Sequence, residues 1–249
     1  MRLHDKKIIV TGGGSGFGAA MCHLFSREGA RVLVADINGD TAARVAAEIG
    51  PGAQPFRVDV ADGAQVRAMV ERALDAFGDL DVVVNDAGYT HRNMPMLEVD
   101  EATFDRVLAV NVKSLYWTAK AAVPVFRRRG GGAFLNIAST AGIRPRPGLT
   151  WYNGSKGAAV VLTKSMAVEL APDRIRVNAL CPVLAATGML EAAMGTSDTP
   201  ENRARFVSTI PMGRLAEPDD VARAAVYFAS DESAFVTGVC MPVDGGRTI

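Results

Sequence analysis

The sequence lacks the features of a nucleic-acid-binding, secreted or membrane-spanning protein. Lys plus Arg and Asp plus Glu number 27 each among its 249 residues, so there is no basic excess to attract nucleic acid. No run of 18 apolar residues is present, the length that a membrane-spanning helix requires. The first residues, "MRLHDKKIIVTGGG", hold only a short apolar run, which indicates a strand rather than a signal peptide. We therefore expect neither nucleic-acid nor membrane partners.

Cysteine and histidine are also scarce. The three cysteines, Cys22, Cys181 and Cys240, are widely spaced and odd in number, so they fit neither a disulfide framework nor a zinc site. They suit the reducing conditions of the cytoplasm. The three histidines lack the spacing of metal ligands. We predict a cytoplasmic protein without a metal centre.

Short runs rich in β-branched residues alternate with longer segments of helical periodicity. The predicted strands are 6–10, 31–35, 54–58, 81–85, 133–137, 174–180 and 238–243. Helical patterns include 17–28, 41–49, 64–77 and 112–129. This alternation indicates βαβ units around a parallel sheet, and the almost entirely apolar runs indicate helices on both faces. No linker divides the chain, so we predict one α/β domain over residues 1–249. A long excursion in the least sheet-like stretch predicts a substrate lid at about 184–214.

A glycine-rich turn follows the first predicted strand. "IIVTGGGSGFG" places Gly12, Gly16 and Gly18 at the start of a helix, together with Ser15 and Phe17. Glycines let the backbone approach a pyrophosphate closely, and the helix N-terminus offers free N–H groups and a partial positive charge. The alternative is a plain tight turn, but the position between strand and helix favours a dinucleotide site.

Asp36 ends the second predicted strand. A carboxylate at this position can accept hydrogen bonds from both ribose hydroxyls of an adenosine, and it would repel a 2′-phosphate. Neither Ser15 nor Ile37 supplies a cation for such a phosphate, so we predict NAD (NADH) as the cofactor. The alternative role for Asp36 is a helix N-cap, although Asn38 and Asp40 are better placed for that.

Asp59 and Val60 follow the third predicted strand in "RVDVAD". We expect Asp59 to contact the adenine amino group and Val60 to pack against the ring. Asp59 could equally cap the next helix, and Asp62 competes for that role.

These motifs resemble those of the classical short-chain dehydrogenase/reductase family, in the family's order and spacing along the whole chain. The matching pieces are "TGGGSGFG" (11–18), Asp59, "NDAG" (85–88), Asn111, Ser139, Tyr152 with Lys156 in "TWYNGSK", Pro182 with Thr187, and "VDGG" (243–246). The resemblance implies a Rossmann-type doubly wound parallel sheet of about seven strands and a homotetramer. It implies further cofactor contacts from Asn85, Ala87, Gly88, Tyr152, Lys156, Pro182, Val183 and Thr187.

Two residues depart from the family pattern. Asp86 stands where a second asparagine is usual, which replaces an amide by an acceptor-only carboxylate and predicts weaker links between strands beside the cofactor. Val183 stands where glycine usually follows Pro182, which removes backbone freedom beside the expected nicotinamide.

Tyr152 and Lys156 lie four residues apart and would share one helix face. When hydride reaches a ketone, its oxygen needs a hydrogen-bond donor and then a proton, which Tyr152 can supply. A nearby Lys156 ammonium should lower the pKa of Tyr152 by up to roughly three units. Ser139 would hold the substrate oxygen, and by resemblance Asn111 would hold a water that links Lys156 to solvent. We predict an NAD-dependent oxidoreductase that interconverts a secondary alcohol and a ketone.

The family position of the substrate pocket predicts its lining. These residues are Ser139, Thr140, Ala141, Leu149, Trp151, Leu184, Met189 and Leu190. Their mostly apolar character favours a neutral, medium-sized ketone or secondary alcohol. His91 and Arg92 follow the fourth predicted strand and could instead reach a substrate carboxylate, or they could lie on a solvated loop or at a subunit contact.

Other functions remain open. A 3-oxoacyl-thioester (acyl carrier protein) reductase would prefer NADPH and need basic patches for its acidic carrier. Asp36 and the zero net charge argue against this, although Arg127–Arg129 is a small basic cluster. A non-catalytic NAD-binding sensor, or a methyltransferase, would have no need of Ser139, Tyr152 and Lys156 at these spacings.

Overall fold

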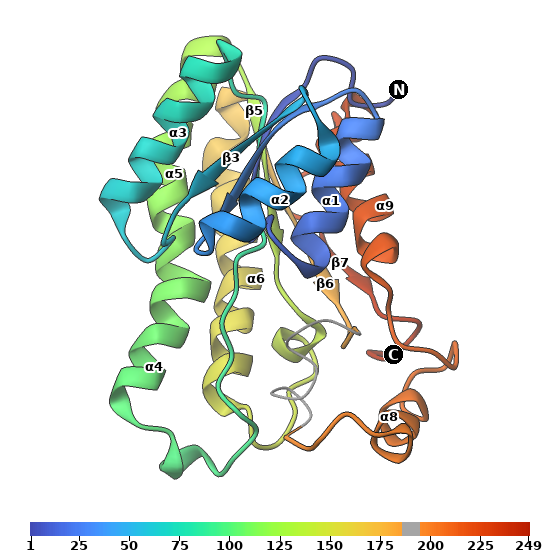
Figure 1. Ribbon diagram of the computed structural model, residues 1–249. Coiled ribbons are helices and arrows are strands. Elements are labelled where there is room, and N and C mark those ends of the chain that lie inside the picture. Colours follow the sequence, from blue (N-terminus) through green and yellow to red (C-terminus); the bar gives the residue numbers. More distant parts are fainter. Residues whose placement is uncertain (186–194) are drawn as a thin grey trace.

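The structure is a computed structural model and describes residues 1–185 and 195–249. Within these residues, seven parallel strands form one sheet in the order β3-β2-β1-β4-β5-β6-β7 (Figure 1). The strands are β1 Lys7–Thr11, β2 Arg31–Asp36, β3 Ala53–Arg57, β4 Val82–Asn85, β5 Gly132–Ile137, β6 Ile175–Pro182 and β7 Cys240–Val243. The predicted seven-stranded doubly wound sheet is thus confirmed. Its winding direction reverses between β1 and β4, where such sheets bind ligands at their carboxyl ends.

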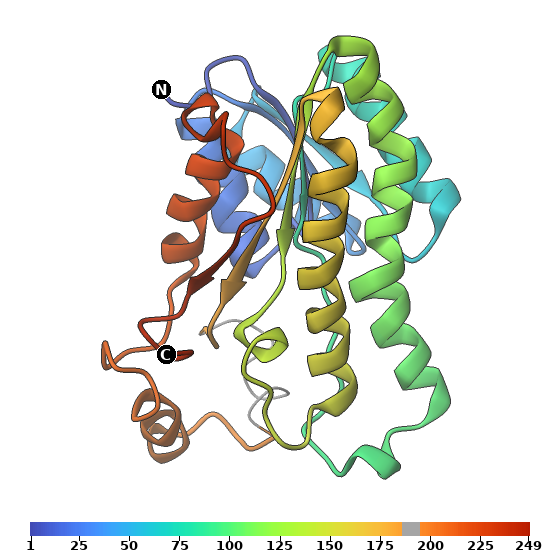
Figure 2. The same cartoon turned by 180° about the vertical axis from the view of Figure 1, so that it is seen from behind.

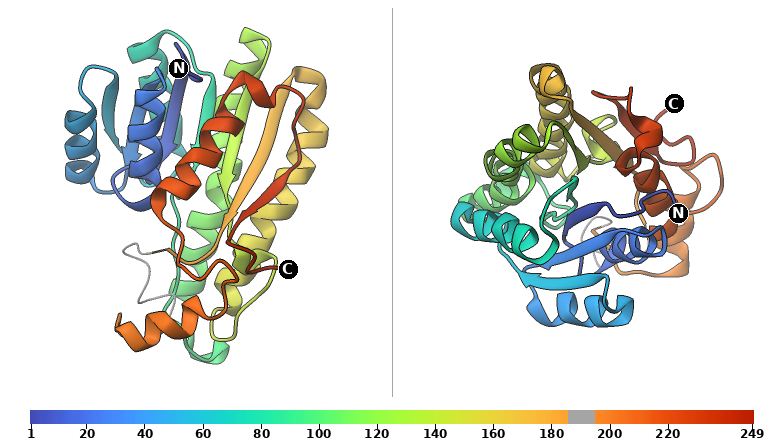
Figure 3. Two further views of the ribbon diagram at one scale, coloured as in Figure 1. Left: turned by 90° about the vertical axis from the view of Figure 1, so that its right-hand side faces the viewer. Right: turned by 90° about the horizontal axis from the view of Figure 1, so that it is seen from above.

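Helices cover both faces of the sheet, as seen from above in Figure 3. One face is covered by α1 Gly16–Arg27, α2 Gly39–Ile49 and α9 Pro218–Ala229, and the other by α3 Gly63–Phe77, α5 Ser114–Arg129 and α6 Thr150–Leu170. Strand side chains alternate between the two layers: Val10 belongs to the same buried cluster as Phe25 of α1, and its neighbour Ile9 belongs to the cluster that holds Phe126 of α5. Burial of both faces explains why the strand runs are apolar throughout.

Two polar side chains determine where helices begin on the cofactor side. Asn38 accepts hydrogen bonds from the backbone of the first turn of α2, and Asp62 does the same for α3. These are the N-caps, so Asp36 and Asp59 are not.

The carboxyl ends of the strands are surrounded by the longest connections. Helices α4 Glu101–Leu108 and α8 Pro200–Val207 extend beyond this edge, and the C-terminus lies there too, whereas the N-terminus lies at the opposite end (Figure 1). No helix in residues 1–185 and 195–249 is long and apolar enough to cross a membrane.

Candidate active site

The glycine turn between β1 and α1 is shaped by close backbone contacts. Gly12 and Gly16 have φ of +71° and +53°, a region that favours glycine. A Cβ on Gly18 would lie 2.1 Å from the carbonyl oxygen of Gly12, so no side chain fits there. Ser15 is exposed at the start of α1, and its hydroxyl makes no capping hydrogen bond. The turn therefore lets a ligand approach its backbone closely and presents a hydroxyl at the N-terminus of α1, which fits a pyrophosphate.

A cleft of about 550 Å³ opens beside this turn. We call it the main cleft. The predicted cofactor residues that line it are Gly12, Ser15, Gly16, Phe17, Asp36, Ile37, Asp59, Val60, Ala87, Gly88, Tyr152 and Lys156. They come from separate places in the sequence and converge at the switch point of the sheet, as a dinucleotide site requires.

Asp36 is held in place by the backbone. Its carboxylate accepts hydrogen bonds from the N–H groups of Gly14 and Asn38, both at 2.9 Å. It lines the main cleft next to the half-exposed Ile37. The carboxylate keeps acceptor capacity for ribose hydroxyls, so this geometry fits NAD.

Arg106 of α4 is a cleft residue that the sequence interpretation missed. It forms a salt bridge with Asp59 at 2.9 Å, and both side chains line the main cleft. Asp59 also accepts from the backbone of Ala61 at 3.0 Å. The sequence around Arg106 does not predict this role, because its partner Asp59 lies in the loop between β3 and α3, far away in sequence.

Asn85 does not line the main cleft. Its buried amide donates to Asn136 of β5 at 2.8 Å, and Asn136 donates to Thr163 of α6 at 2.9 Å. Thr11 also donates to the Val84 carbonyl at 3.3 Å. The Asn85 side chain thus links β4 to β5 and, through Asn136, to α6.

Asp86 turns away from the neighbouring strands. It lies against the glycine turn, where Gly18 N–H donates to its carboxylate, while its own backbone N–H donates to Thr11 at 3.1 Å. Burial raises the pKa of Asp86 to about 7, and the Lys156 ammonium opposes this rise. The strand links run through Asn85, Thr11 and the backbone of Asp86, so the Asp86 carboxylate takes no part in the connection that we expected it to weaken.

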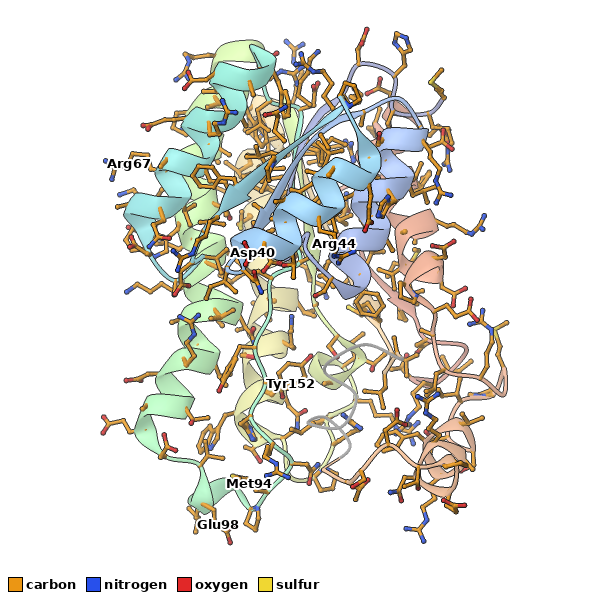
Figure 4. The ribbon with its side chains drawn as sticks, in the orientation of Figure 1. Asp40, Arg44, Arg67, Met94, Glu98 and Tyr152 are labelled. Atoms are coloured by element: carbon orange, nitrogen blue, oxygen red, sulfur yellow. The ribbon has the colours of Figure 1, made fainter. Side chains whose placement is uncertain are left out.

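Ser139, Tyr152 and Lys156 lie close together, where β5 ends and α6 begins. Lys156 is buried, and its ammonium donates to the Ile137 carbonyl at 2.8 Å and lies 5.9 Å from the centre of the Tyr152 ring. Burial lowers the pKa of Lys156 to about 8, whereas Asp86 opposes this shift. Figure 4 shows Tyr152 beyond the carboxyl ends of the strands.

The pKa of Tyr152 is raised in the protein alone, contrary to expectation. Burial raises it, while a hydrogen bond with Ser139 and then the charge of Arg146 lower it. Burial outweighs both opposing effects, and the Lys156 ammonium, 5.9 Å from the ring centre, donates to the Ile137 carbonyl. The phenol therefore stays protonated, as a proton donor must.

Asn111 lies in a π-helical segment, Ala109–Lys113, between α4 and α5. Such segments often occur at functional sites. Its amide oxygen accepts from Tyr89 N–H at 2.8 Å, and its amide nitrogen donates to the Tyr89 carbonyl at 2.8 Å and the Ser155 hydroxyl at 2.9 Å. Ser155 in turn donates to the Tyr152 carbonyl at 2.7 Å. Asn111 thus fixes the turn of α6 that carries Tyr152.

A second pocket, which we call the side pocket, adjoins the main cleft. Phe17, Ala138 and Tyr152 line both. Pro182 and Val183 line the side pocket. The backbone at Val183 has no positive φ, so valine adopts its conformation without strain. Tyr152 therefore lies where a cofactor in one space meets a substrate in the other.

The predicted substrate residues divide into three groups. Ser139, Thr140, Ala141 and Leu184 line the side pocket. Leu149 and Trp151 do not: Leu149 is fully buried, and Trp151 donates to the Met96 carbonyl and packs edge-on against Phe104. Leu149 is the N-cap of α6 and Trp151 is in its first turn, and the packing of this helix start, which the sequence position does not reveal, directs both side chains away from the side pocket. Thr187, Met189 and Leu190 lie outside the described residues.

The side pocket is lined mainly by apolar residues, as expected, but it also holds positive charge that the sequence interpretation did not predict. Arg144, Arg146 and Arg247 line the side pocket, and no acidic residue does so among the described residues. His91 and Arg92 do not line it: His91 is buried against the Arg92 carbonyl, and Arg92 is exposed. The signal available in the sequence was "GIRPRPG" (142–148), a loop with two arginines between Ser139 and Tyr152.

Comparison with known proteins agrees with this geometry. Residues 12–248 match a family model described as Enoyl-(Acyl carrier protein) reductase. The chain is 51% identical to a 4-formylbenzenesulfonate dehydrogenase of Comamonas testosteroni, with full coverage of both chains. It is 38% identical to a 2-(S)-hydroxypropyl-CoM dehydrogenase of Xanthobacter autotrophicus, over 99% of this chain and 98% of the relative. A 3-ketoacyl-(acyl-carrier-protein) reductase from Brucella melitensis, solved with NADH, has a TM-score of 0.94 and 42% identity and covers 99% of this chain and 100% of that one.

Fold, cleft and relatives define a Rossmann-type oxidoreductase. The chain belongs to the short-chain dehydrogenase/reductase family. It is an NAD-dependent enzyme that interconverts an alcohol and a carbonyl compound by hydride transfer.

Proposed function

We propose that Tyr152 is the general acid and base of this reaction, with Ser139 as the substrate-oxygen donor and Lys156 as its electrostatic support. The observation that carries this proposal is the position of Tyr152 at the junction of the main cleft and the side pocket. NAD(H), when bound in the main cleft, supplies or accepts the hydride at the substrate carbon. The Gly12–Gly18 contact, which leaves no room for a Cβ, supports its binding there.

The protein groups handle the proton. In the reduction direction, Tyr152 transfers its hydroxyl proton to the carbonyl oxygen as that oxygen gains charge, and Ser139 donates a hydrogen bond to the same oxygen. Lys156 stabilises the resulting phenolate, and the proton returns from solvent. The water that we expect between Asn111 and Lys156 would carry it. In oxidation the same groups act in reverse, with the Tyr152 phenolate as base.

Replacing Tyr152 by Phe tests this assignment. We expect kcat to fall by at least a thousandfold, while NADH affinity, measured by fluorescence, stays within about threefold, because the glycine turn is elsewhere. Lys156→Ala should be similarly severe. A Tyr152→Phe enzyme that keeps more than a tenth of the wild-type kcat would contradict the role of Tyr152.

A 3-oxoacyl-thioester reductase is the second candidate. The Brucella melitensis relative favours it. Asp36, fixed by two backbone N–H groups, argues against the NADPH that such reductases usually prefer. Steady-state assays of acetoacetyl-CoA and of simple aromatic carbonyl compounds, each with NADH and NADPH, separate the two functions.

We further propose a cytoplasmic homotetramer with a substrate lid at about 184–214. Helices α5 and α6 lie together on one face (Figure 2), and large apolar side chains stand exposed on them: Tyr116 at 51%, Val161 at 62% and Val168 at 80%. Such a surface favours burial against another subunit. Light scattering at micromolar concentration should give about four times the chain mass, and a monomer mass would contradict the tetramer.

The proposed lid is supported by three of its residues. Phe206, Thr209 and Ile210 line the side pocket.

A further inference from the structure

The side pocket carries a concentration of positive charge that hydride transfer itself does not require. Arg144 and Arg146 come from the loop before α6, and Arg247 comes from the C-terminal segment. No acidic side chain lines the pocket among the described residues. Catalysis at Tyr152 needs a hydrogen-bond donor and a proton, and the residues above supply both, so the arginines call for a separate explanation.

The arginines are near one another and near the reaction centre. The guanidinium of Arg146 is half-buried and stacks on the ring of Phe206, 5.1 Å from its centre. Burial lowers the pKa of Arg146, the charge of Tyr152 opposes this, and the charge of Arg247 lowers it further. Two guanidinium groups that line one pocket beside the reaction centre create a positive potential there, and such a potential attracts an anionic group of a ligand.

Arg144 has a different environment. It is exposed, and its guanidinium donates to the backbone carbonyl of Arg247 at 2.7 Å. This bond joins the loop that precedes the catalytic helix to the C-terminal segment, 103 residues away in sequence. Arg144 therefore holds the backbone from which Arg247 reaches the pocket.

We propose that Arg146 and Arg247 bind an oxyanionic group of the substrate, a carboxylate or a sulfonate, and that Arg144 positions Arg247. A planar guanidinium matches the geometry of such groups with two parallel hydrogen bonds. The substrate is then a small alcohol or carbonyl compound that carries its reacting carbon at Tyr152 and an anion toward the arginines. This inference rests on the proposed function and names its substrate class.

The test uses three aldehydes that differ in one group, with NADH as reductant. 4-Formylbenzenesulfonate and 4-formylbenzoate carry the two anions, and 4-(methylsulfonyl)benzaldehyde is nearly isosteric with the sulfonate but neutral. We expect the wild-type kcat/KM to be at least tenfold higher for an anionic aldehyde than for the neutral one. Which anion is preferred then distinguishes carboxylate from sulfonate recognition.

Substitutions assign the selectivity to particular residues. Arg146→Ala and Arg247→Ala should each lower the anionic-to-neutral ratio of kcat/KM by at least tenfold, mainly through KM, and Arg146→Lys should recover part of it. Arg144→Ala should raise KM for the anionic aldehyde, and Arg144→Lys should restore it by keeping a donor to the carbonyl. Arg67→Ala is the control, because Arg67 is exposed on α3, far from Tyr152 (Figure 4).

The outcomes separate this inference from the proposed function. Turnover without preference for an anion, or equal losses on all three aldehydes in the arginine variants, would overturn the inference alone. Arginine-dependent selection of acetoacetyl-CoA over the aryl anions would overturn it in favour of a phosphate-bearing thioester. Absence of turnover with every carbonyl compound would sink the proposed function. Thermal shift with benzenesulfonate on the NADH complex would then decide: a rise in Tm lost in Arg146→Ala supports the anion site, and no rise rejects it.

Discussion

The buried carboxyl group of Asp86 should make the free energy of unfolding depend on pH, and the substitution Asp86→Asn should remove this dependence. Its pKa rises from 3.8 to about 7, mainly through burial. A shift of about three units corresponds to about 4 kcal/mol. Between about pH 4 and 7 the folded chain binds more protons at this site than the unfolded chain, so the free energy of unfolding falls as pH rises. Because the side chain also lines the open main cleft, solvent reduces the cost, and we expect about 1–3 kcal/mol.

The comparison of wild type with Asp86→Asn in urea unfolding, without cofactor, measures this cost. At pH 5 the folded wild type still holds the Asp86 proton that the unfolded chain has lost, so only part of the cost is present and the two proteins should differ less than at pH 8. At pH 8 the variant should be more stable by about 1–3 kcal/mol, a Tm rise of roughly 2–12 °C for a domain of this size. The exposed Asp75 of α3 provides the control substitution, Asp75→Asn, with no such divergence. The reasoning fails if the difference between wild type and Asp86→Asn is the same at pH 5 and pH 8.

Two further predictions concern the main cleft. Gly18→Ala should weaken NADH binding by at least tenfold in a fluorescence titration, because its Cβ would meet the Gly12 carbonyl at 2.1 Å, whereas Gly154→Ala on α6, with nothing within 4 Å, should bind normally. Asp36→Ala combined with Ile37→Arg should shift kcat/KM toward NADPH at least tenfold by removing a repulsion of about 1–4 kcal/mol at about 4 Å and adding a cation. An unchanged cofactor ratio would show that Asp36 does not select against the 2′-phosphate.

The sequence predicted the sheet because strands buried on both faces must be apolar along their whole length. It also predicted the glycine turn and the Ser139–Tyr152–Lys156 set, since their spacing is set by one loop and one helix. The direction of Asp86 could not be predicted, because it depends on the approach of β4 to α1. The place of Arg247 at the side pocket could not be predicted either. Its backbone carbonyl accepts a hydrogen bond from Arg144, which lies 103 residues away in sequence, and no local pattern encodes such a contact.

The C-terminal segment forms part of the pocket wall although it belongs to neither a strand nor a helix. Its residues Asp244–Ile249 follow the last strand and place Arg247 at the pocket, joined to the catalytic loop by one hydrogen bond from Arg144. Exchange of these few residues would alter which substrates fit while the sheet and the proton-transfer groups stay intact. Substitutions confined to residues 244–249 could therefore give relatives of this protein different substrate ranges. For the same reason an affinity tag belongs at the N-terminus, at the opposite end of the molecule (Figure 1).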